Sequence, residues 1–430
     1  MGNHWLYQWI DEYSVTSTHD AESKLRLPGP VARLHELASG APGWTEGDEP
    51  NGKSIVAGST IDFSGRLNCT HSTCLGKQVD RLFSNIWHYF DSVVVEGPSS
   101  SWYLQAIENG TSRGNRDFLW SAGQDIDFLL SLRKLGITDH LTFRTKAHQF
   151  CTHHIEEHAT EAGISHFFQA DFRAEMVDRL KRESNISISG SGRSWHYSLY
   201  HPESPEPFSG YFQSHQKKGK QIKKPTKRQV AEAVVRRSTA ALVYDVATSK
   251  HLSLPLAVEL PYLQVKPEIA TAGKGSRESQ IALDLPLPVM RGMSARDVVL
   301  LRQDLRPHFD RFQYALTEAI REQLARDPER ANTEVAKAVS EEFIRPAFAE
   351  IERGLSESKR SLSVKAGSSV AVGTAVASAG LLTSVPLIIG AGLAAVGVTL
   401  SGLHKHFDDR KEVKTSDVYF LWKAKNGTAR

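Results

Sequence analysis

Cysteine and histidine side chains gather in two short segments of this sequence, NCTHSTC (68–74) and QFCTHHIEEH (149–158). Thiolate and imidazole groups together are a typical zinc ligand set, and four of them from two separate segments would close a tetrahedral structural site. The predicted ligands of such a zinc cofactor are Cys69, Cys74, Cys151 and His154. The alternative is that the cysteines are small buried side chains in a chain that contains 18 histidines.

The second segment also satisfies the pattern His-x-x-Glu-His. On a helix, His154 and His158 would share one face, and Glu157 could act as general base for a zinc-bound water, as in the inverted zinc metallopeptidases. Glu232 is the candidate third ligand. The pattern predicts a zinc-dependent hydrolase as one alternative function, although a histidine-rich segment matches so short a motif easily by chance.

A basic segment follows in the middle of the chain. No acidic residue occurs between Pro207 and Ala231. The candidate anion-binding residues there are Lys217, Lys218, Lys220, Lys223, Lys224, Lys227 and Arg228, followed by Arg236 and Arg237. Such a segment can contact phosphates of nucleic acid or of anionic lipids, and Tyr211, Phe212 and His215 could stack on bases. A nucleic-acid-binding protein using residues 217–237 is therefore a second alternative function, and a solvated linker is the simpler interpretation.

Residues 366–403 contain no Asp, Glu, Lys, Arg or His. With 23% charged residues in the chain, a run of this length arises by chance about 5 times in 100,000 starting points. Pro386 divides the run into two segments, each near the minimum of about 17 residues for one membrane crossing. The pattern predicts an apolar helical hairpin that enters a membrane or is buried as the core of a soluble domain.

The residues around this apolar tract indicate an orientation. Basic side chains flank it at Lys359, Arg360, Lys365, Lys405, Arg410 and Lys411, so both ends are expected on the cytoplasmic side of a membrane. Further on, Tyr419, Phe420 and Trp422 lie beside lysines. Aromatic residues next to lysines suit a membrane interface, and docking of the tail onto the protein is the alternative.

The elements that must position these residues begin with a β-α-β pattern. Strand-like segments cover 55–63, 92–97, 141–146, 186–190 and 194–200, and helix-like segments cover 77–91, 125–135, 154–162 and 170–184. Asp125 and Asp127 form an Asp-x-Asp pair, for which a solvated helix face is expected. No glycine-rich phosphate loop follows the early strands.

The composition changes after these elements. Residues 202–225 are rich in Pro, Gly, Ser and Lys, which predicts a linker, and a helix is expected over 231–249. Two amphipathic helices then follow, the first capped by Ser294 and Asp297, with restarts or kinks at Pro307 and Pro346. The expected domains are 1–201, 202–290, 291–362 and 363–430.

The fold class expected is an α+β or α/β N-terminal region followed by a mostly α-helical C-terminal half with an apolar helical hairpin. Three cysteines are too few for a secreted disulfide framework, and the N-terminus lacks a basic signal-peptide region, so export is not expected. The function expected is a membrane-associated, non-enzymatic effector or scaffold at the cytoplasmic face, with a zinc-stabilised domain. Its expected partners are an anionic membrane surface, a protein partner or second copy, and nucleic acid.

Overall fold

The computed structural model describes residues 4–41, 53–58, 63, 72–110, 112, 114–144, 154–161, 163–192, 194–202, 207–213, 221–258, 276–285, 294–349, 417 and 419–421. The chain divides into two compact units. The first contains Met1–Asp284 and Met290–Leu300, and the second contains Leu285–Val289 and Leu301–Arg430.

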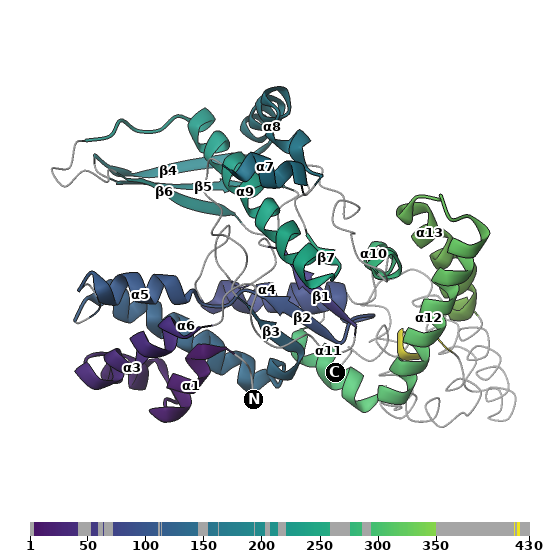
Figure 1. Ribbon diagram of the computed structural model, residues 1–430, viewed down its shortest axis with the longest axis horizontal. Helices are drawn as coiled ribbons and strands as arrows, with labels where there is room; N and C mark the ends of the chain where they lie inside the picture. Colours follow the sequence, from purple (N-terminus) through teal and green to yellow (C-terminus); the bar gives the residue numbers. More distant parts are fainter. Residues whose placement is uncertain are drawn as a thin grey trace, which may run out of the picture. The chain divides into compact units, whose positions relative to one another are not determined.

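A four-stranded parallel sheet organises the first unit (Figure 1). Its strands are β1 (Ser54–Ala57), β2 (Ser92–Val95), β3 (Leu141–Phe143) and β7 (Leu256–Ala257), in the order β3-β2-β1-β7. The connections contain α4 (Ser72–Ile86), α5 (Ser100–Glu108), α6 (Arg116–Leu135) and the 3-10 turn η1 (Thr138–His140). Every residue of β1 and β2 is buried, as their β-branched density predicts, and the β-α-β unit is confirmed.

The strand order reverses beside β1. The chain adds β2 and β3 on one side of β1, and β7 pairs with its other side. The Gly58 N–H donates to the Ala257 carbonyl at 2.6 Å, and a Cβ at residue 58 would lie only 2.8 Å from that oxygen. Close approach of β7 therefore requires glycine at the end of β1. In open α/β sheets, ligands bind outside the carboxyl ends of the strands at such a reversal.

An antiparallel sheet follows, with β4 (Asn185–Ser191), β5 (Ser194–Tyr200) and β6 (Phe208–Gln213) in that order. The first two match the predicted strands. The third lies inside 202–225, where the composition predicts a linker, and here the structure differs from the prediction. Phe208 pairs with Leu199 and is buried, so residues 208–213 form a core strand despite the Pro, Ser and Lys residues that flank them.

Helices cover one face of the antiparallel sheet (Figure 1). They are α7 (Ile155–Glu161), α8 (Ala170–Glu183) and α9 (Lys227–Leu252), with the 3-10 turn η2 (Ser165–Phe168) between the first two. Helix α9 begins with a capping box at Thr226 and contacts β1, β7 and β5. Val56, Leu199 and Val234 belong to one buried cluster, so α9 joins the cores of the two sheets.

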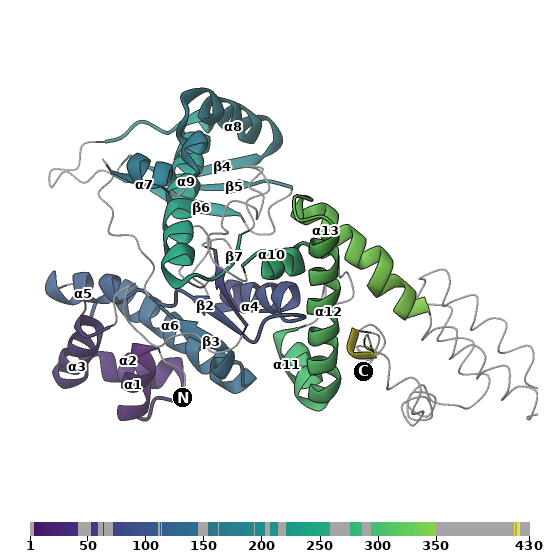
Figure 2. The same cartoon turned by 45° about the vertical axis from the view of Figure 1, so that its right-hand side comes forward.

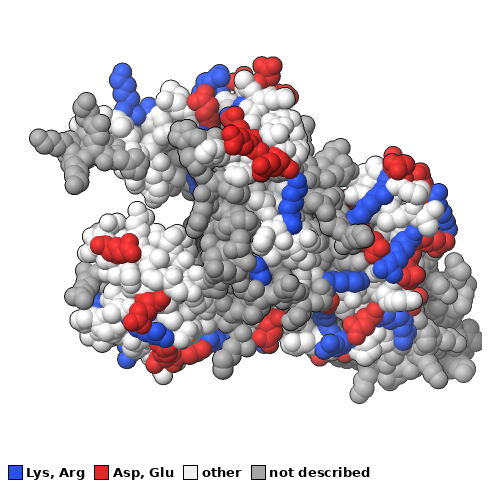
Figure 3. All heavy atoms as spheres, viewed as in Figure 1, with Lys and Arg blue, Asp and Glu red and all other residues white. Residues whose placement is uncertain are grey.

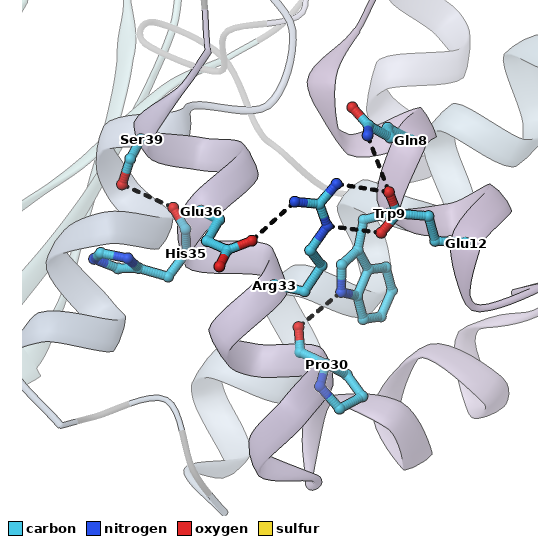
Figure 4. A network of polar contacts seen from close by, with 8 residues as sticks. All are labelled: Gln8, Trp9, Glu12, Pro30, Arg33, His35, Glu36 and Ser39. Atoms are coloured by element: carbon cyan, nitrogen blue, oxygen red, sulfur yellow. Dashed lines mark hydrogen bonds and ion pairs between the residues drawn. The ribbon is translucent and has the colours of Figure 1, made fainter.

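The N-terminal helices α1 (Trp5–Glu12), α2 (Thr18–Leu25) and α3 (Pro28–Ser39) pack on one another and on α5 and α6. Figure 4 shows how α1 and α3 are joined. The Arg33 guanidinium donates to both carboxylate oxygens of Glu12, at 2.8 and 2.7 Å, and to Glu36 at 2.8 Å. Trp9 Nε1 donates to the Pro30 carbonyl at 2.9 Å. The hydrogen bonds from Arg33 lower the pKa of Glu12 to about 2.

Helices fill the described residues after 275. They are α10 (Ser276–Asp284), α11 (Ala295–Asp304), α12 (Arg306–Arg326) and α13 (Asn332–Val339), the last continued by a π-helical turn (Ser340–Ile344) and by helix to residue 349. The predicted cap of α11 is confirmed, because the Asp297 N–H donates to Ser294 Oγ at 3.2 Å. Pro307 lies in the first turn of α12, where the predicted restart occurs.

Amphipathic helices are found where the sequence predicts them, and α12 and α13 lie side by side in the second unit (Figure 2). Their apolar stripes are buried at Phe309, Phe312, Leu316 and Ile320 on α12 and at Val335 and Val339 on α13. A mixed α/β region followed by a helical region thus matches the expected fold class. The apolar tract 366–403 lies outside the described residues.

Candidate functional site

Two of the four predicted zinc ligands, Cys69 and Cys151, lie outside the described residues. Cys74 is half-buried on α4 and forms no disulfide, and His154 is exposed just before α7. Among the residues that the structure describes, no three His, Cys, Asp or Glu side chains are grouped to hold a metal ion. The structural zinc site therefore stays a prediction that depends on the two undescribed cysteines.

The structure brings together the two histidines of the His-x-x-Glu-His motif. The His158 N–H donates to the His154 carbonyl at 3.0 Å, so these residues lie one helical turn apart. His158 Nδ1 contacts the Glu161 carboxylate at 3.1 Å, and Glu157 is exposed. Glu232, the candidate third ligand, forms an ion pair with Arg228 at 3.0 Å. The spacing suits a metal, and a zinc-dependent hydrolase remains a prediction.

Opposite charges are buried at the carboxyl edge of the parallel sheet. Glu96 directly follows β2 and Arg144 directly follows β3, and they are 5% and 6% exposed. The strands remain paired there, since the Arg144 N–H donates to the Val95 carbonyl at 2.9 Å. Neither residue belongs to a recognised motif, although a charged residue directly after a buried strand is a usable signal. Their position is the one at which α/β proteins bind ligands.

Asp125 is not on a solvated helix face, so that expectation is wrong. Asp125 is half-buried, and its carboxylate accepts a hydrogen bond from Tyr103 Oη at 3.0 Å. Burial raises the pKa of Asp125 to about 7, against the opposing effect of this hydrogen bond. Asp127 and Ser131 instead line a cavity of about 250 Å³ with residues of α4. A carboxyl group that titrates near neutrality is a candidate for proton transfer.

The basic segment is only partly described, because Lys217, Lys218, Lys220 and His215 lie outside the described residues. Lys223, Lys224, Lys227 and Arg228 are exposed. Lys224 Nζ lies 5.9 Å from the centre of the Trp195 ring, and Arg228 contacts Asp178 at 3.5 Å. Arg237 donates to the Ser209 carbonyl at 2.7 Å, which ties it to the sheet. The lysines, more than Arg228 and Arg237, can therefore meet an anionic partner, and Arg236 is exposed as well.

Two of the three residues expected to stack on bases, Tyr211 and Phe212, point to opposite faces of the antiparallel sheet. Tyr211 pairs with His196 and is 64% exposed. Phe212 pairs with Trp195 and lies 5.4 Å from Tyr197 on the buried face. Strand alternation makes this separation necessary, so only Tyr211 of the two can reach a ligand from solvent.

The tail of the chain docks onto α12. Tyr419, Phe420 and Leu421 are 2%, 0% and 0% exposed. The Phe420 ring lies 5.0 Å from the Phe309 ring and 6.1 Å from the Phe312 ring, measured between centroids. The short yellow segment beside α12 in Figures 1 and 2 is this contact. Of the two roles considered for these aromatic residues, docking onto the protein is confirmed for Tyr419 and Phe420.

None of the helices formed by the described residues has the length and hydrophobicity that a membrane crossing needs. Comparison of the chain with protein-family models, with curated proteins and with solved structures finds no match.

Proposed function

We propose that the protein is a membrane-anchored, non-enzymatic effector or scaffold. In this proposal residues 366–403 form the anchor, and the α/β unit is held at the cytoplasmic face. The observation that carries the proposal is the path of the chain in the second unit. The described chain leaves α13 at residue 349 and is again on α12 at Phe420, packed against Phe309. The described residues before and after the apolar tract therefore belong to one compact helical unit.

A chain that leaves and returns to one unit suits an even number of membrane crossings. The basic residues on both sides of the tract favour the same topology, because both ends then stay at the cytoplasmic surface. A single crossing would separate the two ends by the thickness of the membrane, about 30 Å of hydrocarbon. It would pull Phe420 out of its buried position on α12.

The length and composition of the tract favour reversible insertion. Each half is near the roughly 17-residue minimum, which at 1.5 Å per residue gives a helix of about 25 Å. Its strongly apolar residues contribute only about −0.3 to −0.6 kcal/mol each, and the Gly, Ser and Thr residues among them offset part of this. A segment so close to balance can change between a packed and an inserted state when a partner or an anionic surface favours one of them.

Flotation with lipid vesicles tests the proposal. The full chain is mixed with vesicles of neutral lipid and with vesicles that contain anionic lipid, and is expected to float with both, more completely with the anionic ones. In a variant with Val376→Lys and Leu393→Lys, each half of the tract carries a charge that costs roughly 2.5–3.5 kcal/mol at a helix centre, so flotation should be lost. Leu300→Lys, at a residue that is 44% exposed on α11, is the matched control.

The proposal fails if the wild-type chain stays at the bottom of the gradient with both kinds of vesicle. It also fails if the double variant floats as well as the wild type, because another surface would then carry the binding.

A further inference from the structure

The antiparallel sheet has one buried face and one open face. Side chains alternate along each strand, and the register places Ile186, Leu199 and Phe208 in one row on the buried face. The open face carries the residues in between. They are Asn185, Ser187, Ser189 and Ser191 on β4, Ser194, His196, Ser198 and Tyr200 on β5, and Ser209, Tyr211 and Gln213 on β6. None of them is an acid, a lysine or an arginine.

Aromatic side chains stand exposed on this open face. Tyr211 is 64% exposed and Tyr200 is 49% exposed. The His196 ring lies beside the Tyr211 ring, with 5.0 Å between the ring centroids. All three residues lie on strands of the sheet, which fixes the positions from which their side chains project. Exposed rings on a rigid sheet, surrounded by hydroxyl and amide groups, are well suited to stack on flat ligands and to hydrogen-bond their edges.

Positive charge lies at one end of the same sheet. The Ile222 N–H donates to the Gly192 carbonyl at 2.6 Å, which fixes residues 221–226 beside the turn between β4 and β5. Lys223 and Lys224 are exposed there, and Lys224 lies over the ring of Trp195, which is on the opposite face of the sheet to His196 and Tyr211. His196 and Tyr211 form the row of the open face two residues from this end. Acidic side chains instead gather over α7 and α8, as Figure 3 shows. A ligand that is both aromatic and anionic complements this arrangement.

We propose that the open face of β4, β5 and β6 binds single-stranded nucleic acid. Bases stack on Tyr211 with His196 and on Tyr200, and Lys223 binds a phosphate at the end of the sheet. His196 and Tyr200 are four residues apart on β5, which is about 13 Å along the strand. At about 3.4 Å per nucleotide, roughly four nucleotides cover this distance. The strand must be unpaired, because the faces of the bases in a duplex are covered by the neighbouring base pairs and cannot stack on protein rings. The proposal does not depend on the membrane anchor.

Fluorescence anisotropy with the full chain in detergent tests the proposal. The probes are labelled 12-nucleotide oligo(U) RNA, oligo(dT) DNA and a duplex of the same length. The chain is expected to bind at least one of the single strands and to bind the duplex at least tenfold more weakly. Tyr211→Ala and Tyr200→Ala should each weaken binding roughly 5- to 150-fold, because one stacked base is lost. Tyr211→Phe keeps the stacking ring and should bind as the wild type does.

The salt dependence of binding tests the phosphate contact. The plot of log affinity against log salt has a slope of about −0.7 for each phosphate contact in single strands, so Lys223→Ala should reduce its magnitude by about 0.7. Tyr314→Ala, at a ring that is 70% exposed on α12, is the control and should change nothing. The proposal is overturned if neither single strand binds at low salt, if Tyr211→Ala binds like the wild type, or if the duplex binds as tightly. Binding of a neutral oligosaccharide in place of the single strands would overturn it as well.

Discussion

Replacing Phe420 by alanine should release the tail from α12. The ring is 0% exposed and lies between Phe309 and Phe312, so its loss removes buried area and two aromatic contacts. A buried Phe→Ala substitution costs about 3–5 kcal/mol. Because 1.4 kcal/mol is a factor of ten, the docked state should lose a factor of roughly 100 or more in stability against the detached state. The α/β unit should keep its own stability.

Amide hydrogen exchange measures this change directly. The peptide that contains residues 419–421 should exchange roughly 100 times faster in the variant, or as fast as an unfolded peptide, while peptides of the β1 and β2 strands keep their protection. Tyr314→Ala removes an aromatic ring from the same helix at a position that is 70% exposed, and should leave the tail protected within about 0.5 kcal/mol. If Phe420→Ala left the exchange of residues 419–421 unchanged, the docking on which the anchor topology rests would be refuted.

Three further predictions concern other parts of the chain. The pKa of Asp125 is about 7 in the folded protein and 3.8 in the unfolded chain. The stability that this group contributes is therefore fully present below pH 4, and the protein loses up to about 4 kcal/mol of it as the pH rises to 7. Asp125→Asn should flatten this dependence in urea unfolding at pH 5 and pH 8, and an equal slope in both proteins would contradict it. Gly58→Ala should destabilise the folded protein by about 1–3 kcal/mol, because the new Cβ would contact the Ala257 carbonyl. Gly76→Ala, at a position in α4 with open space around it, should stabilise the protein by about 0.5–1 kcal/mol. Equal melting temperatures of the two variants would contradict this prediction. Metal analysis should find one zinc per chain. If the site is structural, Cys69→Ser should lose both the zinc and cooperative unfolding, whereas a hydrolase should keep the zinc and lose activity in Glu157→Gln. A wild-type protein that is folded and free of metal would contradict both predictions.

The sequence predicts the buried strands of the parallel sheet well and the others less well. Val93, Val94 and Val95 form a continuous β-branched run because both faces of β2 are covered. β7 has only Leu256 and Ala257, and its existence depends on pairing with β1, which is distant in the sequence. No local pattern of the sequence contains that information.

The antiparallel sheet shows the same limit in another form. The alternation in β6 is a genuine signal, since Phe208 faces the core and Tyr211 faces solvent. It is hidden because Gly210 and the flanking Pro, Ser and Lys residues give the segment the composition of a linker. A Cβ at Gly210 would collide with the Tyr197 side chain, so this glycine is required by cross-strand packing.

The candidate sites differ in how far residue types alone could identify them. The helical spacing of His154 and His158 is confirmed because four residues always return to the same face of a helix. The burial of Glu96 and Arg144 is a property of the assembled sheet edge, which sequence spacing does not encode. The raised pKa of Asp125 likewise comes from burial in the folded protein, which the Asp-x-Asp pattern does not encode, and the hydrogen bond from Tyr103 on a different helix opposes it.

The most direct test of the anchor is fractionation of the full chain, expressed in bacteria, beside a chain that ends at Lys365. The membrane pellet is washed first with carbonate, which removes proteins held only by surface charge, and then with detergent. We predict that the full chain resists carbonate and is released by detergent, and that the shortened chain stays in the supernatant. If both chains are found in the supernatant as single, monodisperse species, residues 366–403 are not a membrane anchor and the proposed function is contradicted.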